Sequence, residues 1–286
     1  TTGPPHSVHL IGLELKSRLN INWISDFRDP WVNLNYLNRF HLLSSSKKCH
    51  KNLRNKVLIN SDAVIVTSEK LKNLFLNITT NVFKITNGFD YINKEINLDK
   101  KFSISHVGSL YPERNPKFLW DILEEVFDGS LLSDLQINFI GNTSEKIKKE
   151  LSKRKFKKSI KFYDYLDYNK ATELMCTSQV LLMVEVNDEE SSYAIPGKLF
   201  DYLNSKRPII SIGPADSEVA QILNNTNSGK FFNYNDVHFL KSHIKKLYDR
   251  FKNGSNNSNN NQIIEKYDRK NLTKKLTEIV ESVAVK

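Results

Sequence analysis

Short apolar runs alternate with amphipathic stretches along the whole chain. The runs with the length and composition of strands are 21–27, 63–66, 82–85, 103–107, 136–140, 160–163, 180–184 and 208–212. Helix-like segments lie between them, for example 7–19, 34–60, 117–127, 170–177 and 217–223, and an amphipathic helix is expected at 262–283. This alternation predicts an α/β protein in which helices cover parallel sheets.

The expected strands form two series, separated by a turn signal at Asn87-Gly88. Residues 87–261 contain enough strands for a complete Rossmann-like domain, which ends in an Asn-rich tract expected to be a surface loop. Residues 1–86 begin at a helix with three strands to follow, too few for the doubly wound sheet that they otherwise resemble. We therefore expect that roughly 100 residues of a truncated first domain are missing, which puts the activity of this fragment in question; the alternative is a short sheet that a partner completes.

The composition indicates which classes of protein can be excluded. No apolar run approaches the roughly 20 residues that a membrane span needs, and Cys49 and Cys176 follow no metal-ligand spacing. We interpret them as free thiols in a reducing cytoplasm. The net charge of +10 predicts an anionic partner. The densest basic stretch, 146–161, lacks the interleaved aromatic residues that stack on bases, so it indicates a solvated helix face or attraction to an anionic membrane surface rather than nucleic-acid binding.

The most informative segment is 196–208, which follows the apolar run 180–184. In a parallel sheet this junction lies at the carboxyl end of a strand, where open α/β folds bind ligands. Pro196-Gly197 leads into a helix start whose free N–H groups favour an anion, and Lys198 adds a positive charge. Asp201 lies one turn later on the same face and can reach a sugar hydroxyl. The alternatives are a surface lysine and a solvated helix carboxylate.

A second candidate group follows the expected strand 21–27. Asp26, Arg28 and Asp29 lie at its carboxyl end, so we expect them to face a ligand cleft. A carboxylate there can act as a general base, or the three charges can form a self-neutralising turn. Both interpretations remain open. His6 and His9, one turn apart on the first helix, indicate packing or capping rather than catalysis.

Several motifs occur in a characteristic order: 2–12, 26–31, 87–90, 108–110 with 114–116, and 196–208. Together they resemble GT-B fold glycosyltransferases, similar to glycosyltransferase family 4. The resemblance implies two Rossmann-like domains that face a cleft, with residues 262–286 crossing back to the first domain. It also implies transfer of a hexosyl or related group from a UDP- or GDP-linked sugar to a hydroxyl acceptor, with retention and with neither metal nor cofactor. The absence of an Asp-x-Asp motif is consistent with this expectation.

The resemblance also implies roles for individual residues. The family hallmark, two Glu separated by seven residues, falls on Tyr193 and Asp201, so Asp201 is expected to bind the ribose. The family's phosphate-binding Arg and Lys fall on Ser109 and Asn115, and Arg114 is expected to grip the phosphate instead. The remaining donor-binding candidates are Gly108 and Ser109, through backbone N–H groups, and Tyr165 and Leu166 at the nucleobase. The alternatives are a salt bridge for Arg114, a plain turn at 108–109, and ordinary core and rim positions for Tyr165 and Leu166.

The predicted product is a surface polysaccharide or lipid-linked glycan, made in the cytoplasm or at the inner face of the plasma membrane. Two other functions remain open on the same fold: a nucleotide-sugar epimerase, which needs no acceptor, and a non-catalytic nucleotide-sugar-binding module.

Overall fold

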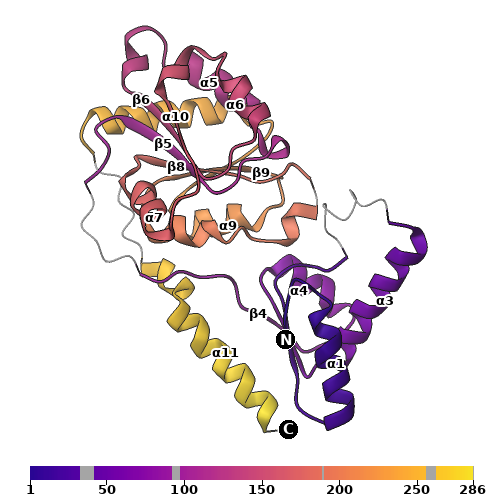
Figure 1. Ribbon diagram of the computed structural model, residues 1–286. Coiled ribbons are helices and arrows are strands. Elements are labelled where there is room, and N and C mark those ends of the chain that lie inside the picture. Colours follow the sequence, from indigo (N-terminus) through magenta and orange to yellow (C-terminus); the bar gives the residue numbers. More distant parts are fainter. Residues whose placement is uncertain (33–41, 92–96, 189, 256–261, 286) are drawn as a thin grey trace. The chain divides into compact units, whose positions relative to one another are not determined.

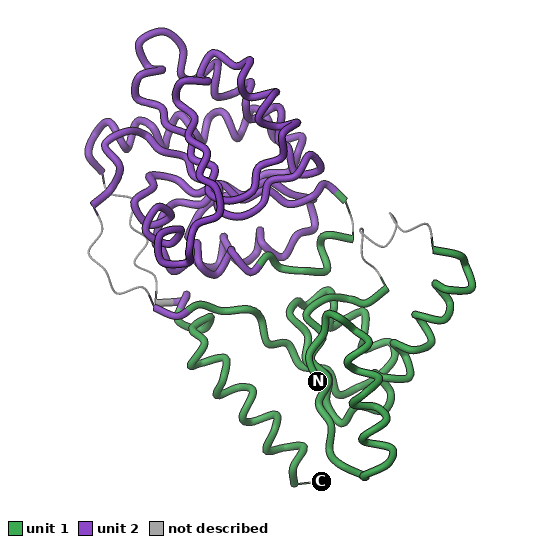
Figure 2. The backbone as a smooth tube through the Cα atoms, viewed as in Figure 1, with its two compact units in different colours: residues 1–89, 188–196, 265–286 green, residues 90–187, 197–264 purple. Residues whose placement is uncertain are grey.

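The computed structural model describes residues 1–32, 42–91, 97–188, 190–255 and 262–285. The chain forms two compact units (Figures 1 and 2). Unit 1 comprises residues 1–89, 188–196 and 265–286, and unit 2 comprises 90–187 and 197–264. This division differs from the sequence-based one in residues 188–196, which the sequence analysis assigned to the second domain, and by three residues at each of the boundaries near 87 and 262.

Unit 1 contains a four-stranded parallel sheet in the order β1-β2-β3-β4. Its strands are β1 (Thr2–Gly3), β2 (Ile24–Phe27), β3 (Ala63–Val66) and β4 (Val82–Lys84), and its first helices are α1 (Val8–Leu19), α3 (Ser44–Asn60) and α4 (Glu69–Leu76). The helix expected over 34–60 is present from Ser44 onward, and its predicted start falls among residues 33–41, outside the described ranges. The two-residue strand β1 was not predicted, because so short a segment carries no periodicity.

Both faces of the unit 1 sheet are buried. Val64 and Val66 point to one face, where they pack with residues of α3 and α4 such as Val57 and Phe75. The alternate residue Ile65 points to the other face with Ala63 and Ile85, and there helix α11 (Arg269–Ala284) covers it through Leu272, Ile279 and Val283. Burial on both sides explains why β3 is a continuous apolar run.

The entry to α11 is fixed by the chain around Gly88. Phe89 N–H donates to the carbonyl of Tyr267 at 3.1 Å, and Arg269 N–H donates to the carbonyl of Phe89 at 3.0 Å. A Cβ at Gly88 would lie 2.4 Å from the Tyr267 oxygen, so this close backbone approach requires glycine. The single helix expected over 262–283 is a 3₁₀ segment (Gln262–Tyr267) followed by α11, with Asp268 capping α11.

The loop 188–196 belongs to unit 1 (Figure 2). It contacts the start of α4. Ser68 Oγ accepts from Leu71 N–H at 3.1 Å and so caps α4, and it donates to the carbonyl of Tyr193 at 2.6 Å. Lys70 Nζ donates to Ser192 Oγ and lies 5.0 Å from the centre of the Tyr193 ring. The position that the family resemblance assigns to a first glutamate is therefore an anchor of this loop.

Unit 2 contains a six-stranded parallel sheet in the order β10-β9-β8-β5-β6-β7. Its strands are β5 (Phe102–Val107), β6 (Leu135–Ile140), β7 (Ile160–Tyr163), β8 (Val180–Val184), β9 (Ile209–Gly213) and β10 (Gly229–Asn233). Numbered within the unit and read from β7, this is the order 3-2-1-4-5-6 of doubly wound nucleotide-binding folds. The sequence indicated five of these strands; β10 was missed because Lys230 and Asn233 interrupt its apolar pattern.

Helices cover both faces of the unit 2 sheet (Figure 1). The helices α5 (Lys117–Val126), α6 (Glu145–Leu151) and α10 (Val237–Lys252) lie on one face, and α7 (Tyr168–Thr177) and α9 (Glu218–Thr226) lie on the other. The main core forms under the first group, where Trp120 and Ile244 pack with Ile104 and Leu182. The predicted fold class, an α/β protein with two parallel-sheet units, is confirmed. None of the described helices is long and apolar enough to cross a bilayer.

Candidate functional site

The strand order of unit 2 defines where a ligand can bind. Strands β5 and β8 are neighbours in the sheet, and the chain proceeds from them toward opposite edges. At such a switch point the connecting segments diverge and leave a crevice outside the carboxyl ends of the two strands. Gly108 follows β5 directly, and Glu185 follows β8 directly. These two residues therefore mark the crevice.

The turn after β5 depends on two glycines. Gly108 has a φ of +98°, and Gly141, which follows β6, has a φ of +116°. A Cβ at Gly141 would lie 3.1 Å from the Gly108 carbonyl oxygen, so the two strand ends pack backbone against backbone. At Gly108 the nearest atom to an added Cβ would be Lys198 Nζ, at 3.9 Å. The space that a side chain at position 108 would occupy is therefore next to the amine of Lys198.

Lys198 begins the short helix α8 (Lys198–Asn204) and is held by uncharged groups. Its Nζ donates to the Val107 carbonyl at 3.2 Å and lies 3.3 Å from His106 Nε2. His106 is buried, and its Nδ1 lies 3.0 Å from the Leu182 carbonyl, which can only accept, so Nδ1 carries the proton and Nε2 accepts from Lys198. The half-buried Lys198 is therefore not the surface lysine that the sequence left as an alternative.

Burial dominates the ionisation of both groups. It lowers the pKa of Lys198 to about 7, with the Arg114 charge acting in the same direction and Glu185 opposing it. It also lowers the pKa of His106 well below its usual range, with Lys198 acting in the same direction. His106 is accordingly a neutral acceptor near pH 7, while Lys198 is divided between amine and ammonium.

Glu185 is a buried carboxyl group at the end of β8 that the sequence analysis did not single out. Ser217 Oγ lies 3.1 and 2.9 Å from its two carboxylate oxygens and donates to the carboxylate. Its Oε2 occupies the space over Gly213, where a Cβ would lie 2.5 Å away. Burial raises the pKa of Glu185 to about 7, against the effects of Ser217, Arg114 and Lys198. The available signal was a glutamate directly after a fully apolar strand.

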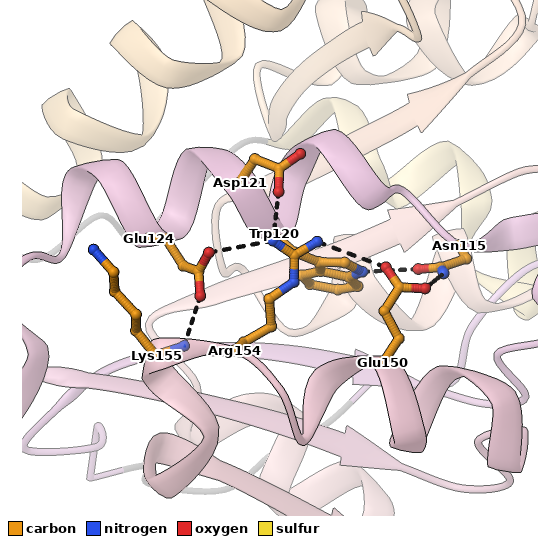
Figure 3. Close-up of polar contacts among 7 residues, drawn as sticks. All are labelled: Asn115, Trp120, Asp121, Glu124, Glu150, Arg154 and Lys155. Atoms are coloured by element: carbon orange, nitrogen blue, oxygen red, sulfur yellow. Dashed lines mark hydrogen bonds and ion pairs between the residues drawn. The ribbon is translucent and has the colours of Figure 1, made fainter.

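The residues around this cluster divide into two kinds. Arg114 is half-buried at the end of a 3₁₀ turn (Pro112–Arg114), and its charge acts on both Lys198 and Glu185. Asn115, where the resemblance implies a basic residue, instead donates to Glu150 at 2.9 Å and accepts from Trp120 Nε1 at 2.7 Å (Figure 3). Asn115 therefore stabilises the contact between α5 and α6.

The other predicted donor-binding residues are more dispersed. Gly197 has helical dihedral angles, φ −55° and ψ −38°, so its conformation does not require glycine. Asp201 accepts from Tyr168 Oη on α7 at 3.2 Å. Tyr165 is 94% exposed, and the half-buried Leu166 follows it; both come after β7, at the edge of the sheet. Ser109 is half-buried beside Gly108, whereas Pro196 belongs to the loop in unit 1. The structure thus gathers Gly108, Arg114 and Lys198 in one cluster.

The three predicted catalytic residues lie in unit 1. Arg28 Nε donates to Asp26 Oδ2 at 2.9 Å, and Arg28 Nη1 donates to Asn87 Oδ1 at 3.3 Å. Asp26 Oδ1 is buried and has no hydrogen-bond partner among the described residues. Burial raises the pKa of Asp29, against the effect of His6. Arg28 therefore holds one oxygen of Asp26, while the other oxygen is buried and unpaired among the described residues.

A cavity of about 610 Å³ lies in the same unit, lined by Pro4, Pro5, His6, Ser7, Leu10, Trp31, His50 and Leu53. His6 Nε2 lies 3.0 Å from the Asp29 carbonyl, and Trp31 has a φ of +62° and donates from Nε1 to His50. His9 is fully buried and stacks on Phe27 with ring centres 4.4 Å apart, a packing role. Within the described ranges, no three His, Cys, Asp or Glu side chains gather into a group that could hold a metal ion.

Comparisons with known proteins establish the fold. No family model and no curated protein matches the sequence. Among solved structures, HepE of Anabaena in complex with UDP-glucose is 13% identical with a TM-score of 0.70, over 96% of this chain and 76% of that one. TarM is 16% identical with a TM-score of 0.67, over 91% of this chain and 50% of that one. Sucrose-phosphate synthase of Thermosynechococcus elongatus is 12% identical with a TM-score of 0.71, over 97% and 71%. The chain spans half the length of TarM, and its fold is of the GT-B type.

Proposed function

We propose that the chain is a glycosyltransferase that moves a sugar from a nucleotide diphosphate donor to a hydroxyl of a glycan or lipid-linked acceptor. The observation that carries this proposal is the amine of Lys198 beside Gly108 at the switch point of the unit 2 sheet. Structures of the same fold support it, since HepE is described in complex with UDP-glucose and the pneumococcal O-GlcNAc transferase GtfA with UDP and GlcNAc.

In this proposal the diphosphate lies against Gly108, where the missing side chain permits close approach of the backbone. Negative charge grows on the diphosphate as the sugar leaves, and preorganised positive groups stabilise that charge. Lys198 and Arg114 supply it, so the reaction needs neither a metal ion nor a cofactor. Backbone groups at Ser109 and Gly197 complete the phosphate contacts.

The remaining site residues position the two substrates, which lowers the entropic part of the barrier. Asp201 binds the ribose hydroxyls, and Tyr165 and Leu166 contact the nucleobase. On the acceptor side, the carboxylate of Asp26 accepts a hydrogen bond from the attacking hydroxyl, while Arg28 fixes the orientation of this carboxylate. Asp29 is the alternative base, because burial raises its pKa toward that of a useful proton acceptor. The anomeric configuration is retained.

Calorimetric titration with UDP and with GDP tests the donor site. Wild-type protein is expected to bind at least one of them, and Lys198→Met is expected to weaken that binding by about 10- to 100-fold, because a charge-assisted hydrogen bond contributes about 1.5–3 kcal/mol. Asp201→Ala is expected to weaken binding through the ribose. His243→Gln, on α10 against Phe232, changes a half-buried side chain outside the predicted site and should bind like wild type.

The absence of heat with every nucleotide, with the melting temperature intact, would contradict the donor site. Turnover is tested separately by following release of UDP or GDP with and without hydroxyl acceptors. Release that depends on the acceptor supports transfer. Conversion of the donor sugar with no acceptor would instead identify an epimerase, and tight binding without any turnover would identify a binding module.

A further inference from the structure

Lys198 is surrounded by one permanent charge and several groups that can change their charge. Arg114 carries the permanent positive charge. Glu185 faces the cluster from the end of β8, and the charge of Asp216, from the loop after β9, acts on Glu185. His106 on β5 is the direct neighbour of the amine. Among the described residues, no carboxylate lies within ion-pair distance of Lys198 Nζ, whose partners are His106 Nε2 and the Val107 carbonyl.

We propose that binding of a nucleoside diphosphate sugar at this site takes up a proton from solvent, converting Lys198 from a mixture of amine and ammonium into ammonium. The inference rests on the donor site proposed above and concerns its protonation. The geometry supports it, because Nζ is held by two uncharged acceptors next to the position over Gly108 and has no counter-ion until an anion arrives.

The direction of the proton transfer follows from the charges. In the free protein, burial and Arg114 hold the pKa of Lys198 at about 7, so above pH 7 most of it is amine. An opposite charge within about 4–6 Å shifts a pKa by about 1–3 in favour of the charged form. A bound diphosphate therefore keeps Lys198 protonated up to pH 8 or beyond. It also raises the pKa of Glu185, because like charges repel, so both groups shift toward their protonated forms.

Linkage turns this shift into a measurable slope. The decrease in the logarithm of the association constant per pH unit equals the number of protons taken up on binding. Below about pH 6 Lys198 is already ammonium, so the affinity is independent of pH. Between pH 7 and pH 9 the affinity should fall by up to about tenfold per pH unit.

UDP-glucose is the appropriate probe, because its diphosphate has no group that titrates near neutral pH, whereas a terminal phosphate has a pKa near 6. Calorimetry at pH 7.5 in two buffers of different ionisation enthalpy gives the number of protons directly. For wild-type protein we expect an uptake of about 0.5–1 proton.

Two substitutions and one control assign the proton. Lys198→Arg keeps a cation that does not titrate, so it should bind UDP-glucose with a smaller proton uptake than wild type, because only the share of Glu185 remains. Glu185→Gln removes a carboxylate that raises the pKa of Lys198, so the fall in affinity should begin at a lower pH. His243→Gln should behave like wild type, since the pKa of His243 is about 4 and it is neutral throughout this range.

Equal affinity for UDP-glucose from pH 6 to pH 9 with no proton uptake would overturn the inference and leave the donor site standing. Proton uptake as large in Lys198→Arg as in wild type would also overturn it, because another group would then carry the proton assigned to Lys198. Failure of wild-type protein to bind UDP-glucose or UDP at any of these pH values would instead contradict the proposed function. Melting temperatures of each variant show whether it folds, and the wild-type measurements decide the question even if a variant does not.

Discussion

Gly108 and Gly129 are two residues of unit 2 with left-handed φ angles, +98° and +60°, but their surroundings differ. A Cβ at Gly108 would lie 3.9 Å from Lys198 Nζ, whereas a Cβ at Gly129 would have no atom within 4 Å. Gly108→Ala is therefore expected to cost about 1–3 kcal/mol of unfolding free energy through backbone strain. It should also weaken UDP binding at least tenfold, because a methyl group takes space beside the amine. Urea unfolding and calorimetry measure the two effects.

Gly129→Ala is the matched control, since it imposes a milder left-handed strain of about 1 kcal/mol far from any crowding. It should leave UDP binding unchanged. If both variants lose binding equally, the effect of Gly108→Ala comes from general destabilisation and the role assigned to the turn is wrong.

Some site residues could be predicted from local sequence motifs, whereas others depend on contacts between strands that are distant in sequence. The segment around Lys198 was identifiable from the sequence. A glycine, a cation and an apolar helix face occur together within the seven residues 197–203, in the connection that follows strand β8. His106 and Glu185 were not, because their proximity to Lys198 depends on the pairing of β5 with β8, which are separated by two other strands in sequence. Burial and charge shift their ionisation only once that pairing exists.

At the scale of elements, Arg154 joins two helices of unit 2 (Figure 3). Its guanidinium contacts Asp121 and Glu124 of α5 and lies 3.6 Å from Glu150 of α6. Its side chain is only 18% exposed. Arg154 belongs to the basic stretch that the sequence indicated as a solvated face or membrane contact, and the structure assigns it to helix packing instead.

Arg154→Leu is expected to destabilise unit 2 by about 1–3 kcal/mol, because three carboxylates then lose their shared cation in a partly buried place. Lys155→Ala serves as the comparison: that side chain is 68% exposed and 3.7 Å from Asp128, so its loss should change stability by less than about 0.5 kcal/mol. Chemical unfolding of both variants decides the matter, and equal effects would show that Arg154 has no special structural role.

Strands with a clear apolar pattern could be predicted from the sequence, whereas strands β10 and β1 could not. The buried runs of β3 and β8 are fully apolar, since helices or loops cover both faces of each strand. Strand β10, at the edge of its sheet, mixes apolar and polar residues, and strand β1 has only two residues. The break between the final 3₁₀ segment and α11 lies where Asp268 pairs with Phe89, a residue distant in sequence.

At the scale of the whole molecule, the charge of +10 remains to be explained by a partner. We propose an anionic membrane surface, and the exposed residues Lys153, Lys157 and Lys158 of unit 2 are its candidate contacts. Changing all three to Glu should reduce sedimentation with phosphatidylserine-containing vesicles, since each basic residue near such a surface contributes about 1 kcal/mol. Added salt should reduce the binding of wild-type protein in the same assay.

The control is an equal change of net charge elsewhere, with Lys270, Lys274 and Lys275 of α11, which are also exposed, replaced by Glu. Retained binding in this control and lost binding in the first triple variant supports a specific surface. Equal losses in both would mean that net charge alone drives the attraction, and no binding by wild-type protein would exclude the membrane partner.

The cover that α11 gives to Ala63, Ile65 and Ile85 has a consequence for synthesis. After the ribosome has synthesised residues 1–89, it must still synthesise all of unit 2 before helix α11, which covers this face of the sheet, is made. Until then, a nascent polypeptide presents an apolar surface of the kind to which chaperones bind and through which chains aggregate. This face of unit 1 is therefore covered only after unit 2 has been synthesised, although residues 1–89 precede unit 2 in the chain.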